Sequence, residues 1–159
     1  MSGAVEKTLK ARKAFHASIG LEVKLKNKAL LEIAKTIEKN KKKILEANKK
    51  DVRVAERNKI TKTLIARLKL NEQKIKTIAY SVRSVVKLDN PIGKTLEAKE
   101  LDKNLVLYKV STPIGVIACI FESRPDVVPQ IASLCLKSGN SVIMKGGSEA
   151  LNSNRILYK

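Results

Sequence analysis

Apolar residues recur every three or four positions through much of residues 1–94, the spacing that places them on one face of an α-helix. Asn71 and Glu72 precede the second of two such stripes, and they suit a helix N-cap and first turn. The first stripe contains Leu30, Ile33, Ala34, Ile37, Ile44 and Leu45, and the second contains Ile75, Ile78, Ala79, Val82, Val85 and Val86. The pattern therefore predicts that residues 1–94 form a helical region.

The period changes between residues 95 and 111. Leu105 and Leu107 alternate with Val106, Tyr108 and Val110, which is typical of a β-strand. Asp102-Lys-Asn104 supplies turn residues before this run, so we predict a β-hairpin. A single hairpin is only marginally stable in water, so we expect another subunit or another part of the protein to cover it.

Residues 112–159 combine strand and helix patterns. Residues 114–121 and 142–144 are short apolar runs typical of strands buried on both faces. Between them, apolar residues from Val127 to Cys135 follow helical spacing, Lys137 suits the helix C-terminus, and Gly139 ends the helix. Two strands joined by a helix predict a right-handed parallel βαβ unit, so the chain belongs to the α/β class.

Polar residues follow both predicted strands, at the edge where open α/β sheets bind ligands. Glu122-Ser-Arg124 follows the first strand, and Lys145-Gly-Gly-Ser-Glu149 follows the second. Gly146 and Gly147 permit positive φ and a close ligand approach, and Ser148 can cap the next helix. The alternative is an ordinary strand-to-helix turn with a solvated lysine, because neither common phosphate-binding glycine motif is present.

The charge of the chain suggests a different class of function. There are 33 Lys and Arg against 15 Asp and Glu, a net charge of +18, which invites a nucleic-acid-binding or protein-interaction interpretation. Residues 1–110 carry 28 of the basic and 12 of the acidic residues. Only 3% of residues are aromatic, so we interpret the lysines as solvated helix faces with pairs such as Glu38 and Lys42.

Other candidate sites are weak. His16 is the only histidine, so we expect no metal site. Cys119 and Cys135 fall within a predicted strand and on the apolar face of a predicted helix, so we expect neither to be a catalytic nucleophile. No disulfide framework, secretion signal or membrane span is indicated, which favours a cytoplasmic location.

Joined motifs in the second half of the chain resemble the γ-glutamyl phosphate reductase family of the aldehyde dehydrogenase superfamily. They are Glu122-Ser-Arg-Pro-Asp-Val127, Ser133-Leu-Cys-Leu-Lys-Ser-Gly-Asn140 and Lys145-Gly-Gly-Ser-Glu-Ala150. The first half is similar to that family at Ala47-Asn48 with Asp51-Val52, at Arg67 to Leu70, around Tyr80 to Arg83, and at Asp89 to Gly93. The resemblance extends over nearly the whole chain.

The resemblance implies an aldehyde dehydrogenase-like fold that reduces L-glutamyl 5-phosphate to its semialdehyde with NADPH, in proline biosynthesis. Residues 1–94 would be the helical part of the cofactor-binding domain, 95–111 the hairpin of an oligomerisation region, and 112–159 the first βαβ part of an NADP-binding domain. The family's catalytic cysteine lies beyond position 159. We therefore expect an N-terminal fragment with no catalytic residue, inactive alone, from a homo-oligomeric enzyme.

The resemblance also assigns binding residues. Lys145 matches the lysine that holds the adenosine ribose or its 2′-phosphate, and Ser148 falls where NAD-preferring relatives often have glutamate. Lysine attracts a 2′-phosphate and serine does not repel it, so we expect NADP, held at Lys145, Gly146, Gly147 and Ser148. Ser123 and Arg124 would bind the substrate, with Arg124 on a phosphate or carboxylate. The alternative is that Arg124 only pairs with Glu122 or Asp126 at the surface.

Overall fold

The computed structural model describes residues 3–159, in which seven α-helices, one short 3-10 helix and four strands follow one another. The helical region contains α1 (Gly3–Ser18), α2 (Val23–Lys39), α3 (Lys41–Arg57), α4 (Lys62–Leu68) and α5 (Glu72–Val86). The hairpin contains β1 (Thr95–Asp102) and β2 (Leu105–Val110). The final part runs through β3 (Val116–Phe121), α6 (Val127–Lys137), β4 (Ser141–Gly146), the 3-10 turn η1 (Ser148–Ala150) and α7 (Leu151–Tyr158). The predicted helical region, hairpin and βαβ unit are all present.

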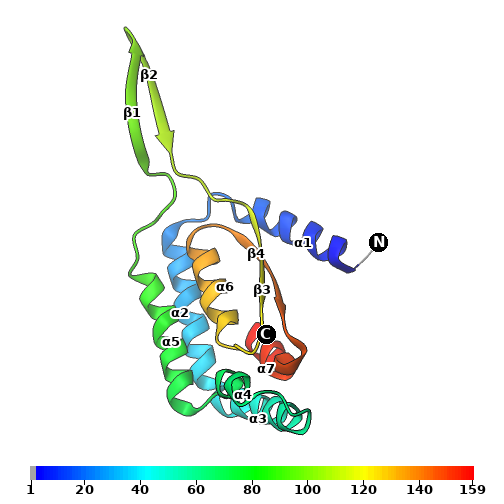
Figure 1. Ribbon diagram of the computed structural model, residues 1–159. Helices are drawn as coiled ribbons and strands as arrows, with labels where there is room; N and C mark the ends of the chain where they lie inside the picture. Colours follow the sequence, from blue (N-terminus) through cyan, green and yellow to red (C-terminus); the bar gives the residue numbers. More distant parts are fainter. Residues whose placement is uncertain (1–2) are drawn as a thin grey trace.

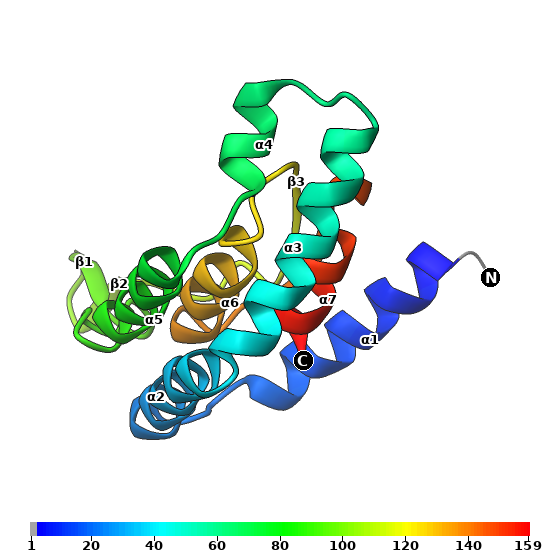
Figure 2. The same cartoon turned by 90° about the horizontal axis from the view of Figure 1, so that it is seen from below.

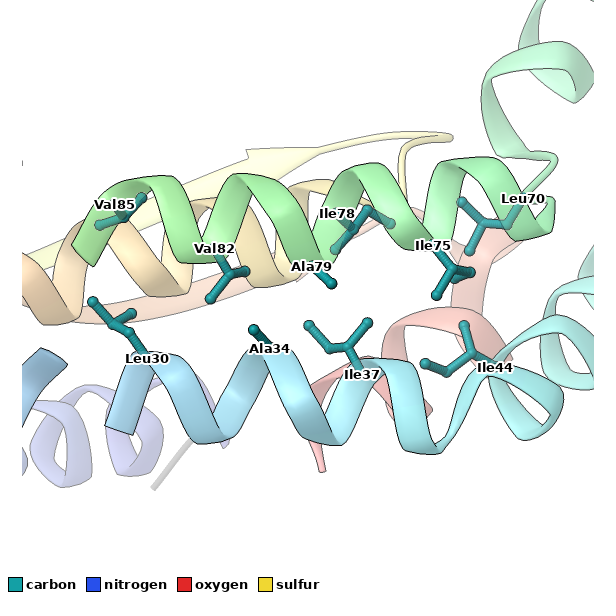
Figure 3. Close-up of a cluster of buried hydrophobic side chains, with 10 residues drawn as sticks. All are labelled: Leu30, Ala34, Ile37, Ile44, Leu70, Ile75, Ile78, Ala79, Val82 and Val85. Atoms are coloured by element: carbon teal, nitrogen blue, oxygen red, sulfur yellow. The ribbon is translucent and has the colours of Figure 1, made fainter. Parts of the chain in front are cut away.

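The main hydrophobic core lies between α2 and α5, which run side by side (Figures 1 and 3). The apolar stripes predicted from the sequence meet there, and Ile44 from α3 and Leu70 from the loop before α5 extend the cluster. Its buried members are Leu30, Ala34, Ile37, Ile44, Leu70, Ile75, Ile78, Ala79, Val82 and Val85. Burial of a large aliphatic side chain contributes about 1.5–3 kcal/mol relative to exposure, so this cluster holds the helical region together.

One detail of the helical prediction is wrong. The first stripe spans two helices, because the chain turns at Asn40 between α2 and α3. Glu38 consequently does not pair with Lys42; it forms a bidentate ion pair with Arg83 of α5, and this hydrogen bonding lowers the pKa of Glu38. The predicted N-cap is confirmed, because Asn71 Oδ1 accepts from the N–H of Lys74 at 2.7 Å.

The β1–β2 hairpin projects away from the rest of the molecule (Figure 1). The strands are antiparallel, and Asn104 has the positive φ of 64° that its turn requires. Every residue of both strands is exposed, including Leu105, Leu107 and Tyr108. The hairpin therefore presents an uncovered apolar surface.

β3 and β4 form a parallel pair in which Ile120 lies beside Lys145 and Phe121 beside Gly146. Both strands thus end at the same edge, and α6 connects them as predicted. The expectation of full burial on both faces is wrong for β3, where Ile120 is 80% exposed. The reason is that the sheet has only two strands, so both of its edges are open and few elements cover it.

Lys137 has a different role from the expected one at the end of its own helix. Its side chain is buried, and its ammonium group donates to the carbonyl oxygen of Val86 at 3.0 Å and to Asn27 Oδ1 at 2.8 Å. Val86 is the last residue of α5, where unpaired carbonyl groups favour a positive charge. Lys137 therefore fastens α6 to α5 and α2.

We expect Lys137→Met to lower the free energy of unfolding by about 2 kcal/mol, because two partly buried acceptors lose a charged donor. Urea unfolding followed by circular dichroism measures this change. Lys39→Met, on the exposed surface of α2, is the control and is expected to change stability by less than about 0.5 kcal/mol. Equal stability of the two variants would contradict a fastening role.

Candidate functional site

The polar turns that follow β3 and β4 are joined directly to each other. The N–H and the Oγ of Ser123 both donate to the carboxylate of Glu149, the latter at 3.0 Å. Ser123 is only 2% exposed and has φ of 47°, a conformation that is uncommon for a residue with a side chain. Burial by itself would raise the pKa of Glu149, but hydrogen bonds from its own backbone and from Ser123 outweigh burial and lower the pKa. Glu149 is thus an ionised clamp between the two turns.

Gly146 and Gly147 lie in this site, but they do not use the positive φ that the sequence suggested. Gly147 has φ of −66°, and neither glycine is among the residues with positive φ. The structure needs glycine for space, because a Cβ atom on Gly146 would collide with the side chain of Asn154 and one on Gly147 with the carboxylate of Glu149. A larger residue at position 147 would therefore displace the clamp.

The predicted cap by Ser148 is also not observed. Ser148 begins the 3-10 turn η1, its side chain makes no cap hydrogen bond, and α7 starts after Ala150. Lys145, at the end of β4, is exposed and forms no ion pair with any residue of the described chain 3–159. An exposed ammonium group without an ion-pair partner in residues 3–159 thus lies beside this turn.

The N-terminus of α7 is instead capped by Asp51 of α3, a role that the sequence analysis missed. The buried carboxylate of Asp51 accepts from the backbone N–H groups of Asn152 and Ser153 and from both of their side chains, at 2.6–3.1 Å. Asn48, one turn earlier, bonds to the Leu68 carbonyl, the Leu70 N–H and Ser153 Oγ. The only signal for this network in the sequence was the family resemblance of Ala47-Asn48 and Asp51.

Arg124 extends from the turn after β3, and its guanidinium group lies 3.1 Å from Asp126 Oδ2. One of the two pairings that we considered, the one with Asp126, is therefore present, and the one with Glu122 is not. The Arg124 side chain is 54% exposed, and exposed pairs of this kind are weak and exchange readily. Arg124 therefore keeps the capacity to bind an anionic ligand.

Arg124 also lines a large groove of about 990 Å³ between this turn and the helices α4 and α5. Besides Arg124, its charged lining residues are Lys62, Arg67, Lys74 and Asp126, and Thr77 and Gln130 add polar groups. The groove therefore has four cationic side chains and one carboxylate. Its size and charge suit a small anionic molecule.

The cysteines and possible metal ligands complete the inventory of reactive groups. Burial raises the pKa of the Cys135 thiol, and the nearby Cys119 raises it further, so Cys135 has little thiolate character. Residues 3–159 contain no cluster of three His, Cys, Asp or Glu side chains able to hold a metal ion. Every helix in the same range is too short or too polar to span a lipid bilayer.

Comparison with known proteins identifies the family. No protein-family model matches the chain. However, a γ-glutamyl phosphate reductase of Brachyspira hyodysenteriae is 54% identical over 152 residues, which cover 93% of this chain and 35% of that protein. The chain belongs to the γ-glutamyl phosphate reductase family. It spans about a third of the length of the curated relatives that it matches.

Solved structures agree with this assignment. The crystal structure of γ-glutamyl phosphate reductase from Saccharomyces cerevisiae superposes with a TM-score of 0.95 at 37% identity, covering 99% of this chain and 40% of the yeast protein. Two more distant structures share the fold. A probable aldehyde dehydrogenase from Listeria monocytogenes has a TM-score of 0.65 at 15% identity, covering 97% of this chain and 31% of that chain. PnpE in complex with nicotinamide adenine dinucleotide has a TM-score of 0.67 at 20% identity, covering 95% of this chain and 29% of that chain. The expected aldehyde dehydrogenase-like fold is thus confirmed, and a separate basic nucleic-acid-binding module is not favoured.

Proposed function

We propose that this chain supplies the nucleotide-binding residues and part of the substrate site of an NADPH-dependent γ-glutamyl phosphate reductase. The reaction converts L-glutamyl 5-phosphate to glutamate 5-semialdehyde and phosphate. The observation that carries the proposal is the joined edge of the β3–β4 sheet, where Lys145 and Arg124 extend from two turns fastened by Ser123 and Glu149. Family membership supplies the reaction, and this edge supplies residues that suit its cofactor and substrate.

The cofactor that these residues suit is NADP. The ammonium group of Lys145 is free to pair with a 2′-phosphate, and Ser148 adds no opposing charge. The carboxylate of Glu149 stays ionised while it accepts from Ser123, so it opposes the phosphate slightly, and the charge of Lys145 must outweigh it. Bound NADPH would supply the hydride, while Lys145 of this chain holds its ribose phosphate.

The same proposal extends to the organisation of the protein. Residues 1–94 and 112–159 would belong to one cofactor-binding domain, and the exposed hairpin 95–111 would contact another subunit of a homo-oligomer. No residue of this chain is proposed as the nucleophile, since Cys135 is buried with a raised pKa and Cys119 lies within β3. A cytoplasmic location would suit this metabolic reaction and its soluble cofactor.

A chimera tests the proposal. Residues 1–159 would replace the matching segment of the Brachyspira hyodysenteriae reductase, and the reverse reaction would be followed as NADPH formation from NADP⁺, phosphate and glutamate 5-semialdehyde. Activity that prefers NADP⁺ to NAD⁺ is the expected result. A correctly folded chimera without this activity would overturn the proposal.

In this chimera, Lys145→Gln is expected to raise the KM for NADP⁺ about 10-fold, because a charge-assisted contact with the 2′-phosphate contributes about 1.5 kcal/mol. The KM for NAD⁺, which has no such phosphate, is expected to change less than about 3-fold. Lys49→Gln, which makes the same charge change on the exposed surface of α3, serves as the control. An equal effect on both cofactors would refute contact between Lys145 and the 2′-phosphate.

A further inference from the structure

We infer that Arg67 of α4 binds the α-carboxylate of the substrate across the groove from Arg124, which binds the phosphate end. This inference rests on the proposed function, because it assigns the two ends of the glutamyl phosphate molecule to the two sides of one groove. Neither the sequence motifs nor the β3–β4 edge pointed to Arg67 as a ligand-binding residue.

The position of α4 makes this arrangement possible. Figures 1 and 2 show α4 next to the loop that leads from β3 into α6, with the start of α5 beside it. Arg67 from α4 and Arg124 from that loop both line the groove of about 990 Å³. Two arginines from segments far apart in sequence thus face one cavity with room for an amino acid phosphate.

The four cationic side chains of the groove differ in the contacts that they already make within the chain. Lys74 donates to the carbonyl oxygens of Lys69 and Ala66 at 2.6 and 3.2 Å, so its charge neutralises the C-terminal end of α4. Arg124 is paired with Asp126. Within the described part of the chain, neither Arg67 nor Lys62 forms an ion pair, so these two charges remain for a ligand.

The orientation of the substrate follows from the chemistry. The acyl carbon that carries the phosphate is the atom that is reduced once the phosphate has left, so this end of the substrate must face the nicotinamide of the cofactor. Arg124 follows β3 at the same sheet edge as the proposed cofactor turn, because its neighbour Ser123 is bonded to Glu149 there, so we place the phosphate end at Arg124. Arg67 lies on the other wall, where the α-carboxylate of an extended glutamyl chain would arrive.

An arginine suits this role better than the neighbouring Lys62. Its planar guanidinium group donates two parallel hydrogen bonds to a carboxylate, whereas a lysine acts as a point charge. Lys62 would instead add to the general attraction of the groove for a substrate with more negative than positive charges. Arg67 therefore sets specificity for an α-carboxylate, and Lys62 contributes to the rate of capture.

Kinetic measurements on the chimera distinguish binding of the α-carboxylate by Arg67 from binding of the phosphate by Arg124. Arg67→Gln is expected to lower kcat/KM for glutamate 5-semialdehyde about 10- to 100-fold, since a bidentate charged contact is lost. For pentanal, in which a methyl group replaces the carboxylate and the amine is absent, the same variant should change kcat/KM by less than about 2-fold, as should the KM for phosphate. Arg124→Gln should raise the KM for phosphate with both aldehydes.

Two further variants control this experiment. Arg53→Gln, which makes the same charge change on the exposed face of α3 outside the groove, should leave all constants unchanged. Arg67→Lys should recover only part of the lost activity with the semialdehyde, because the charge returns without the bidentate geometry. Equal losses with both aldehydes, or no loss in Arg67→Gln, would overturn the assignment while the reductase proposal stands.

A measurement on the 159-residue chain keeps the test independent of the chimera. L-Norvaline presents an α-carboxylate with no net charge, and norvalinamide lacks the carboxylate. Nuclear magnetic resonance titration should show groove residues responding to norvaline, with at least about 10-fold weaker binding for norvalinamide and for Arg67→Gln. No response to norvaline, or an equal response in Arg67→Gln, would contradict the assignment.

Discussion

Asp51→Ala is expected to lower the free energy of unfolding by about 2–4 kcal/mol, the largest stability effect that we expect from a single substitution in this chain. The buried carboxylate accepts four hydrogen bonds from Asn152 and Ser153, at the positive end of α7. Alanine would leave the N–H groups of Asn152 and Ser153 without their acceptor, and that of Ser153 is buried. The loss would therefore loosen the contact between α3 and α7, which the Asn48–Ser153 hydrogen bond and the packing of Ile156 and Leu157 against the core still hold.

Urea unfolding followed by circular dichroism measures this effect. Asp89→Ala is the matched control, because the Asp89 side chain is 89% exposed and pairs only with Lys94 at the surface. We expect the control to change stability by less than about 0.5 kcal/mol. Comparable stability of the Asp51 and Asp89 variants would contradict the capping role of Asp51.

Glu149→Ala is expected to have the largest effect on function within the proposed reductase. The left-handed conformation of Ser123 costs about 1–3 kcal/mol and persists because Glu149 accepts both of its hydrogen bonds. Without this clamp the two turns would separate, and Arg124 and Lys145 would lose their relative positions. We expect kcat/KM of the chimera to fall about 10- to 100-fold, since misplacement of about 1 Å has effects of this order.

The pH dependence of stability provides a second test of the contact between Glu149 and Ser123. The pKa of Glu149 is lower in the folded state than its ordinary value of 4.5. The ionised carboxylate therefore stabilises the fold fully above pH 4.5. This contribution is lost as the pH falls from 4.5 through the lowered folded pKa. Glu149→Gln should therefore be less stable than the parent chain at pH 6, and the difference should shrink towards pH 3. A difference that does not depend on pH would contradict an ionised clamp.

The sequence predicted the architecture well where periodicity carries the information. The stripes around Leu30 and Ile75, the hairpin around Asn104 and the βαβ unit were all confirmed. The turn at Asn40 was missed because no glycine or proline marks it, and the two flanking helices share one apolar face. The Glu38 pairing failed for the same reason, since Lys42 lies beyond this turn.

The candidate site was predicted less completely. Its residues could be named from two strand ends, because parallel strands present their carboxyl ends at one edge. The partners of those residues could not be predicted, since Ser123 and Glu149 are 26 positions apart and Asp51 and Ser153 are 102 apart. Local reasoning instead assigned the cap to Ser148, the nearest serine. The glycines at 146 and 147 were recognised, but for their φ angles and not for the side chains packed against them.

The phosphate requirement of the chimera tests the central claim most directly. With glutamate 5-semialdehyde and NADP⁺, NADPH should form only when inorganic phosphate is present, because phosphate is the group that releases the acyl product in the reverse reaction. This result would establish that residues 1–159 complete a γ-glutamyl phosphate reductase. NADPH formation without phosphate, with glutamate as the product, would contradict the account and indicate a hydrolytic aldehyde dehydrogenase.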